Sequence, residues 1–363
     1  MYQLLEKRKS RFQPYVYNNF LFTGTKEQLF ITETNNISNI NTLDIPNCMP
    51  GFSSWHNLVF LWITPQYPKP EFTLKLDLAN YLVYQMPLEN FLVISNIENG
   101  RLLFMNYENN IEYIGGYDIN SSSILWQTEN KNRFTLLLSN EKFFSRDTIE
   151  SSFYCESILS GERFWTFDLK SLPKYVHYEG DKTEEITKVI GVFNKLVWLS
   201  TKGNCIISLD IESGDLRNFI EWKVDENTVS PDAHSALLHY EKGEIHILNT
   251  DYYTIISAET GKVILNVKQI EFSNELPLYR RFFTRLYGDL MCFSCHLKST
   301  GKDFIGIFNI ANQKLEWIYE MQLEFIKGKG MAFLPPSSIP QISNNKLFIM
   351  DSEGVIYIFE KEV

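Results

Sequence analysis

One short pattern recurs along the chain and limits the folds open to it more than any other feature. Each copy has an apolar run typical of a β-strand, then Asp or a small polar residue, then a few turn-forming residues, then a second apolar run. The clear copies begin at Leu76, Tyr117, Phe167, Leu209, Ile256 and Phe308, and weaker copies begin at Leu29 and Ile356. A unit that repeats every ~40–50 residues is typical of repeat architectures.

The turns inside two of these copies suit tight hairpins. Gly214 and Gly261 can take the positive-φ backbone that such a turn requires. An acidic residue precedes each glycine, and its carboxylate can accept hydrogen bonds from the N–H groups of the turn. We therefore predict that each copy is a hairpin of the two outer strands of a sheet.

Two more strand-like runs lie ahead of most copies, such as residues 235–240 and 244–248. Four strands in about 40–50 residues make one blade of a β-propeller. We predict an all-β fold in which residues 1–363 form a single β-propeller domain of four-stranded antiparallel blades, eight in number, with seven as the alternative. The segment near Tyr2–Leu5 is expected to complete the C-terminal blade, so that the terminal strands close the ring and no sheet edge stays exposed.

The turn units 209–215 and 256–262 resemble the quinoprotein-like (pyrroloquinoline-quinone-type) β-propeller repeat. The late tryptophans of units 117–126 and 308–317 add to the resemblance. It implies a superfamily rather than one function. WD-repeat proteins are the alternative, but the sequence lacks the Gly-His and Trp-Asp pairing of those repeats.

The resemblance implies three kinds of relative: secreted quinone-dependent dehydrogenases, an outer-membrane assembly lipoprotein and soluble binding propellers. The dehydrogenases often stack the quinone on a bridge between adjacent cysteines, and no two of the five cysteines here are adjacent. The lipoprotein has a lipidated Cys after a signal peptide, and the sequence shows neither. We therefore expect the non-enzymatic branch, with no cofactor and no catalytic residue.

The net charge of the chain indicates which kinds of partner it can bind. The sequence has 34 Lys and Arg against 44 Asp and Glu, a net charge of −10. Because binding to phosphate groups needs a basic surface, this charge argues against nucleic acid as the main ligand. It favours a basic protein partner.

The first residues and the cysteines bear on the compartment. A signal peptide places basic residues ahead of an apolar run, and residues 1–10 have the reverse order. No run is long enough to cross a membrane. The odd, sparse set of cysteines suits reduced thiols rather than a disulfide framework. We expect a cytoplasmic monomer without a membrane segment, and the Asn-, Ile- and Lys-rich composition indicates a bacterial source.

Two charged linkers between repeats are the predicted partner-binding site. One has Pro231 among acidic residues and a histidine, and the other has arginines after Pro277. Such linkers run along one rim of a propeller channel, where arginines beside carboxylates can recognise a protein or an anion. The alternative is a solvated loop with weak surface ion pairs. The predicted residues are Asp225, Glu226, Asp232, His234, Arg280 and Arg281.

Two further groups could bind a metal or haem. Cys292-Phe-Ser-Cys295-His296 matches a haem-attachment motif, but two cysteines three residues apart on a strand point to opposite faces, so we predict a structural strand. His239 and His246 would face each other if Lys242-Gly243 formed a two-residue turn. An acidic neighbour would then allow metal binding, but we favour two half-buried histidines bonded to backbone, and no metal.

The tryptophans are predicted to pack between blades, because aromatic side chains bury much apolar area. They are Trp126, Trp165, Trp198, Trp222 and Trp317. No motif of a serine hydrolase, a phosphate-binding loop or a zinc protease is present.

These observations lead to one main hypothesis. The chain is a cytoplasmic β-propeller scaffold for protein–protein interaction, and one concrete form is an immunity protein that neutralises a basic toxin. The alternative is an enzyme or sensor that uses a small molecule or a metal in the central channel. A structural subunit of a larger assembly is the third interpretation.

Overall fold

The structure, a computed structural model, describes residues 2–63, 72–88, 90–131, 133–147, 149–221, 233–248, 252–268, 280–297, 302–321, 323–326, 330–333 and 337–362. These residues form eight four-stranded antiparallel sheets and one two-stranded hairpin. The two helices among them are short 3-10 helices, η1 (Leu169–Ser171) and η2 (Ala233–Ser235). No helix in this part of the chain has the length and hydropathy of a membrane span. The sheets confirm the all-β propeller fold, and their number shows eight blades rather than seven.

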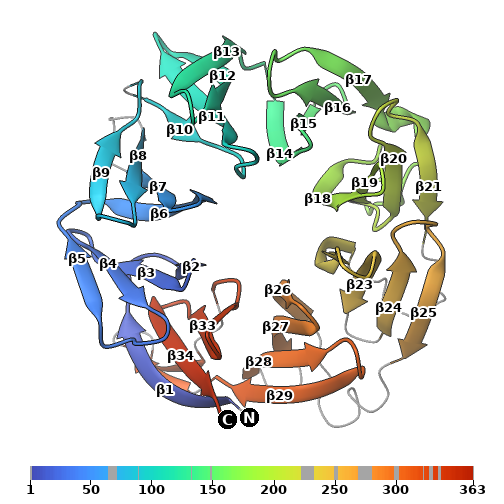
Figure 1. The fold of residues 1–363 in the computed structure, drawn as a ribbon. Coiled ribbons are helices and arrows are strands. Elements are labelled where there is room, and N and C mark those ends of the chain that lie inside the picture. Colours follow the sequence, from blue (N-terminus) through green and yellow to red (C-terminus); the bar gives the residue numbers. More distant parts are fainter. Residues whose placement is uncertain are drawn as a thin grey trace. The chain divides into compact units, whose positions relative to one another are not determined.

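The chain divides into two compact units, each with four of these sheets. One unit comprises Met49–Lys223 and Ser257–Lys262. In each of its sheets, every strand pairs with the next one in the chain (Figure 1). Its strands are β6 (Cys48–Trp55), β7 (Leu58–Ile63), β8 (Phe72–Asp77) and β9 (Leu82–Gln85); β10 (Leu92–Val93), β11 (Arg101–Glu108), β12 (Ile111–Asp118) and β13 (Ser123–Glu129); β14 (Arg133–Ser139), β15 (Lys142–Asp147), β16 (Ser152–Ser157) and β17 (Arg163–Asp168); and β18 (Ile186–Phe193), β19 (Leu196–Thr201), β20 (Ile206–Asp210) and β21 (Leu216–Ile220).

The other unit comprises Met1–Cys48, Val224–Ile256 and Val263–Val363. Its strands are β2 (Tyr15–Tyr17), β3 (Phe20–Gly24), β4 (Leu29–Glu33) and β5 (Ile40–Leu43); β22 (Leu237–His239), β23 (Glu244–Leu248), β24 (Tyr252–Ser257) and β25 (Val263–Lys268); β26 (Arg280–Tyr287), β27 (Leu290–Leu297), β28 (Lys302–Asn309) and β29 (Lys314–Glu320); β32 (Gln341–Ser343), β33 (Lys346–Met350), β34 (Val355–Lys361) and β1 (Tyr2–Lys9); and the hairpin of β30 (Leu323–Ile326) and β31 (Gly330–Phe333).

The two ends of the chain meet in one sheet. β1 pairs antiparallel with β34, from Tyr2 opposite Lys361 to Lys9 opposite Val355. The C-terminal sheet therefore takes its outermost strand from the N-terminus, as predicted. This pairing covers the edge that β34 would otherwise expose.

Polar side chains hold the hairpin turns between outer strands. The Asp210 carboxylate accepts hydrogen bonds from the N–H groups of Glu212 and Ser213, at 2.9 and 3.2 Å. Asp77, Asp118 and Asn309 accept equivalent bonds in their own turns. These contacts confirm the predicted turn chemistry at Gly214. In the Gly261 turn the Thr260 N–H donates instead to the Ser257 hydroxyl, at 3.2 Å.

One copy of the repeat was placed wrongly by the sequence pattern. Phe167 and Asp168 end the outermost strand β17, and η1 follows instead of a hairpin. The hairpin of this sheet lies earlier, where Gly161 takes a φ of 73° between β16 and β17. The Asp168 carboxylate accepts a hydrogen bond from the Lys170 N–H, so the same Asx chemistry here begins a 3-10 turn.

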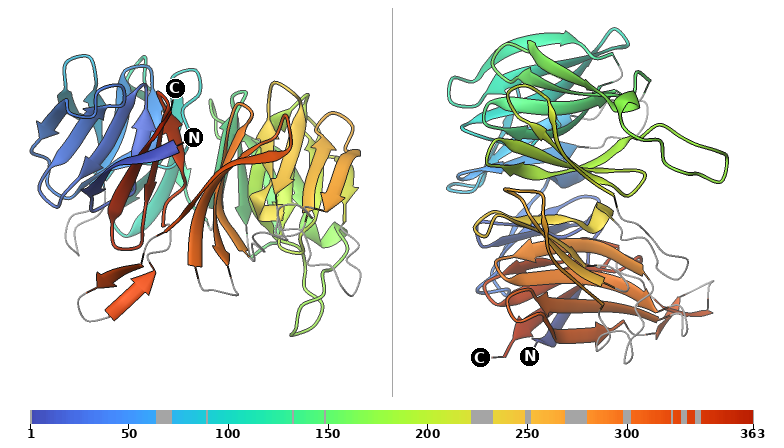
Figure 2. Two further views of the ribbon diagram at one scale, coloured as in Figure 1. Left: turned by 90° about the horizontal axis from the view of Figure 1, so that it is seen from below. Right: turned by 90° about the vertical axis from the view of Figure 1, so that its right-hand side faces the viewer.

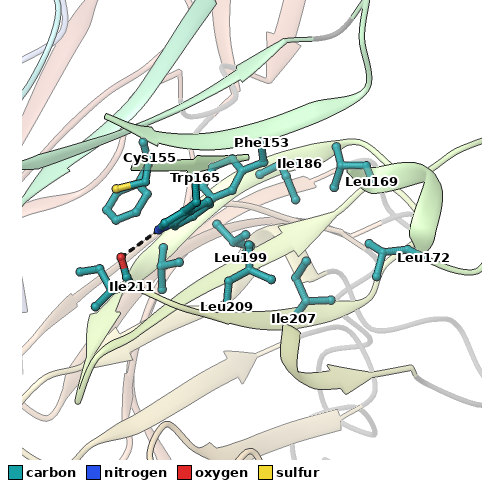
Figure 3. Close-up of a cluster of buried hydrophobic side chains, with 12 residues drawn as sticks. Phe153, Cys155, Trp165, Leu169, Leu172, Ile186, Leu199, Ile207, Leu209 and Ile211 are labelled. Carbon is teal, nitrogen blue, oxygen red and sulfur yellow. Dashed lines mark hydrogen bonds between the residues drawn. The ribbon is translucent and has the colours of Figure 1, made fainter. Parts of the chain in front are cut away.

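Tryptophans join neighbouring sheets within each unit. The indole N–H of each donates to a main-chain carbonyl beyond its own sheet: Trp126 to Ile158, Trp165 to Ile211 and Trp317 to Tyr2, at 2.7, 3.0 and 2.9 Å. Figure 3 shows Trp165 among buried apolar side chains with its N–H directed at the Ile211 carbonyl. Trp198 is fully buried as well. The predicted packing role is confirmed for these four, and Trp222 lies outside the described residues.

Candidate functional site

A projecting segment follows η1, and we call residues 173–185 the arm. It leads from β17 to β18 and extends away from the sheets of its own unit, as the green segment in both views of Figure 2 shows. Tyr175 and Lys182 exchange two main-chain hydrogen bonds, at 3.1 and 3.0 Å. The Gly180 N–H donates to the His177 carbonyl at 2.9 Å. The arm is therefore a small closed hairpin rather than an open loop.

Buried groups fix the base of the arm. Leu172, just ahead of it, belongs to the hydrophobic cluster that includes Trp165. Glu184 is almost fully buried, and its carboxylate accepts a hydrogen bond from the Gly203 N–H at 2.9 Å. A Cβ on Gly203 would lie 2.5 Å from the Cβ of Tyr175. Only glycine fits this close approach, so the base of the arm packs directly against its own unit.

The tip of the arm presents apolar and aromatic surface. Val176 is 87% exposed and Tyr178 is 89% exposed, the highest values for large hydrophobic side chains in the described part of the chain. The ring of His177 lies 4.1 Å from that of Tyr178. Glu179 pairs with Lys182 at 3.3 Å, so these two charges offset each other. The arm thus holds an exposed tyrosine on a support whose backbone is already ordered.

The structure does not bring the predicted linker residues together. Asp225, Glu226 and Asp232 lie outside the described residues. His234 falls in η2, where only its backbone is described.

The placement of the two arginines in a linker is wrong. Arg280 and Arg281 begin strand β26, opposite His296 and Cys295 of β27. Their place after Pro277, between two repeats, had indicated a linker. Phe282 and Leu286 of the same run pair with β27 as strand residues, and a break in register falls between Phe282 and Arg285.

The histidine pair lies on adjacent strands, but in a different register from the one predicted. The turn covers residues 240–243, so His239 pairs with Glu244 and His246 pairs with Leu237. The two rings are diagonal neighbours on one face of the sheet, with their centroids 6.0 Å apart. A four-residue turn replaces the predicted two-residue turn because only Gly243 takes a positive φ there.

Both histidines are buried in a polar network. His246 Nδ1 lies 2.8 Å from the Tyr253 hydroxyl, and its Nε2 lies 3.3 Å from Glu244 Oε2 without hydrogen-bond geometry. His239 Nε2 lies 3.6 Å from Asp289 Oδ1. Burial, with the nearby His239 and Lys242, lowers the pKa of His246 to about 4. A histidine in this setting is neutral at pH 7.

This network does not form a metal site in the structure. Within the described ranges, no three His, Cys, Asp or Glu side chains are placed to hold one ion. Lys242 pairs with Asp289, which holds the pKa of that carboxyl below its usual range. The favoured interpretation of the histidines as packed, hydrogen-bonded groups fits this geometry, although His246 bonds to a side chain rather than to backbone.

The haem-like motif lies on a strand, as predicted. Cys292 and Cys295 are both buried on β27. Cys292 packs with Tyr2 and Trp317, whereas Cys295 packs with Tyr253 in a separate cluster. The two thiols therefore face opposite sides of the sheet, and burial raises the pKa of Cys292.

Comparisons with known proteins address the fold. Neither a model of a known protein family nor a curated protein matches the chain. Among solved structures, BamB from Moraxella catarrhalis matches at 12% identity with a TM-score of 0.57, over 99% of this chain and 100% of that one. A europium-containing methanol dehydrogenase matches at 9% identity with a TM-score of 0.57, over 99% and 93%. The chain has a β-propeller fold. The computationally designed protein Ika8 matches too, at 10% identity with a TM-score of 0.61, over 99% of this chain and 98% of that one.

These likenesses stop at the fold. One of the matched proteins is an enzyme by name and another is a design, and a shared fold does not transfer an activity. The candidate site must therefore be argued from the side chains of this chain.

Sequence reasoning missed the arm. The repeat pattern predicts a hairpin over Phe167–Tyr175, and this prediction includes no separate segment after it. The available signal was the polar stretch between Asp168 and Ile186, which is long for a connection between blades and carries Pro173 and two tyrosines.

Proposed function

We propose that this protein is a binding scaffold that docks another protein through the arm. The exposure of Val176 and Tyr178 at its tip carries the proposal. Large apolar side chains left in water on an ordered support are typical of interaction sites rather than of a solvated loop. Tyrosine is also among the residues that dominate binding energy at protein interfaces.

The shape of the arm indicates the shape of its partner. A projecting tyrosine needs a concave apolar pocket, and its hydroxyl needs a polar group at the far end of that pocket. Main-chain hydrogen bonds between Tyr175 and Lys182 close the arm, and Glu184 holds its base. Docking therefore costs little conformational entropy, because the backbone of the arm is already ordered.

The finer form of the proposal concerns the identity of the partner. A net charge of −10 speeds encounter with a basic protein, and a basic toxin neutralised by an immunity protein is one such partner. We propose with it that the protein is a cytoplasmic monomer and that the acidic residues Asp225 and Glu226 of one linker bind the partner.

The test compares two tagged proteins expressed in the native host. One is wild type and the other has Val176→Ser and Tyr178→Ser, which remove apolar surface and no buried contact. We expect wild type to retain one stoichiometric partner and the double variant to bind it at least about tenfold more weakly, since two exposed anchors are lost.

Ile149→Ser is the matched control. Ile149 is 72% exposed in another turn of the same unit, so its replacement also removes exposed apolar surface. The control should retain the partner. Equal retention by wild type and the arm variant would contradict the role of the arm. Loss in both the arm variant and the Ile149→Ser control would point instead to a general effect of apolar surface.

A further inference from the structure

The outermost strands of the sheets differ in how well they are protected from pairing with another chain. Six of the outermost strands have a break in register with the strand that they pair with. They are β13, β17, β21, β25, β29 and β1. Bulges twist an edge strand away from regular pairing. β5 and β9 pair with their neighbours without such a break.

β9 carries neither of the chemical protections usual at a sheet edge, a charged side chain or a proline. Its sequence Leu-Val-Tyr-Gln has no charge and no proline, and all four residues are exposed. Leu82 is 53% exposed, Val83 37% and Tyr84 42%. β5 is different, because only alternate residues are exposed there. β9 is thus a regular, uncharged edge with apolar side chains in solvent, which is the arrangement that soluble proteins usually avoid.

Both faces of β9 are open. Leu82 and Tyr84 lie opposite Asp77 and Lys75 on one face, while Val83 lies opposite the buried Leu76 on the other. The Lys75 ammonium lies 5.3 Å from the centre of the Tyr84 ring, which keeps that ring against the sheet.

We propose that β9 is a docking edge for an extended segment of another polypeptide, which adds to the sheet as a further strand. β9 is the last strand of its sheet, and in the part of the chain that the structure describes no strand pairs with one row of its main-chain N–H and C=O groups. Only an extended backbone matches such a row. The Leu82 N–H already donates to the Asn80 side chain at 2.9 Å, so this group is not available to an added strand.

The two open faces define the chemistry of the added strand. Because apolar side chains stand on both faces of β9, the added strand has β-branched or aromatic residues at successive positions and no charge at its centre. A second copy of this chain is a poor occupant, since each copy has a net charge of −10. Basic residues flanking the apolar centre suit that charge. This inference concerns a different surface from the arm and does not depend on it.

The test uses a fluorescent synthetic peptide with Val, Tyr and Thr at its centre and a lysine at each end. A second peptide has the same side chains but N-methyl groups on alternate residues, which block pairing with a strand edge. We expect saturable binding of the first peptide to the full chain, followed by fluorescence anisotropy, and at least about tenfold weaker binding of the methylated peptide.

Variants of the full chain test whether the peptide binds at β9. Leu82→Lys combined with Tyr84→Glu places charges on the edge at two exposed positions and should weaken binding by about tenfold or more. Ile264→Lys, on the exposed but bulged β25, and Tyr178→Ser, on the arm, should bind the peptide as wild type does. Circular dichroism confirms that each variant is folded.

Three results would overturn the inference. They are absence of peptide binding, equal binding of the methylated peptide, and equal binding by the β9 variant. A dimer of wild type that the β9 variant abolishes, seen by sedimentation velocity, would also overturn it in favour of self-pairing. Loss of partner binding at the arm with intact peptide binding would contradict neither this inference nor the proposed function.

Discussion

At the scale of the residue, glycines sit where the packing between sheets leaves no room for a side chain. Gly214 takes a φ of 76°, and a Cβ there would lie 2.7 Å from the ring of Trp165. Gly161 meets Trp126 in the same way. The tryptophan covers the next turn and bonds to its carbonyl, so the glycine and the indole N–H act together.

Gly214→Ala tests this arrangement against a matched glycine. Gly288 also takes a positive φ, of 53°, but a Cβ there would meet nothing within 4 Å. We expect Gly288→Ala to lower the free energy of unfolding by about 1 kcal/mol through backbone strain alone. Gly214→Ala should cost about 1–3 kcal/mol more, because the indole must also move. Equal losses in urea unfolding would contradict the packing argument.

The buried histidine gives the stability a pH dependence. Folding lowers the pKa of His246 from the usual 6.5 of a histidine to about 4, chiefly through burial. The unfolded chain therefore binds a proton that the folded chain excludes. His246 contributes no penalty above pH 6.5, and stability falls as the pH drops from 6.5 to about 4, by about 3 kcal/mol in total.

His246→Gln isolates this contribution. The variant should lose the part of the pH dependence between 6.5 and 4 that wild type shows in urea unfolding. His56→Gln, at an exposed histidine, should follow wild type across the same range. Parallel profiles of wild type and His246→Gln would contradict this, because they would show that folding does not change proton binding by His246.

At the scale of the element, the strands and their turns could be predicted from the sequence, while the arm could not. The copies at Leu209 and Ile256 have a strand, a capped turn and a glycine in order, and each forms the expected outer hairpin. Near Phe167 the same Asp-containing pattern begins a 3-10 turn. An Asx cap serves both structures, so the pattern does not distinguish them. The prediction placed Arg280 and Arg281 in a linker because they follow Pro277, whereas β26 already begins at Arg280.

Glu184 should decide how firmly the arm is held. Glu184→Ala leaves the half-buried Gly203 N–H without this acceptor, at a cost of about 1 kcal/mol. We expect faster hydrogen exchange at Tyr175–Lys182 and unchanged exchange in β11 and β12. Glu179→Ala, at the exposed tip, is the control and should leave exchange at the base of the arm unchanged. Slow exchange of the arm in Glu184→Ala would show that other contacts hold it.

At the scale of the whole molecule, the pairing of the termini completes the last sheet. β1 covers the edge of β34, and the Tyr2 carbonyl accepts the indole N–H of Trp317. Deletion of residues 1–9 should therefore lower the melting temperature by several degrees and promote aggregation through the exposed β34. Leu5→Ser, at an exposed position of the same strand, should have the same melting temperature as wild type. An unchanged, soluble deletion variant would show that the closure is dispensable.

The central claim is that the arm contacts a protein partner, and site-specific photocrosslinking in the native host tests it most directly. A photoreactive phenylalanine derivative replaces Tyr178 in one protein and Ile149 in another, both highly exposed in the same unit. We expect one discrete crosslinked partner from position 178 and none from position 149. No crosslink from position 178, or the same set of crosslinks from both positions, would contradict it.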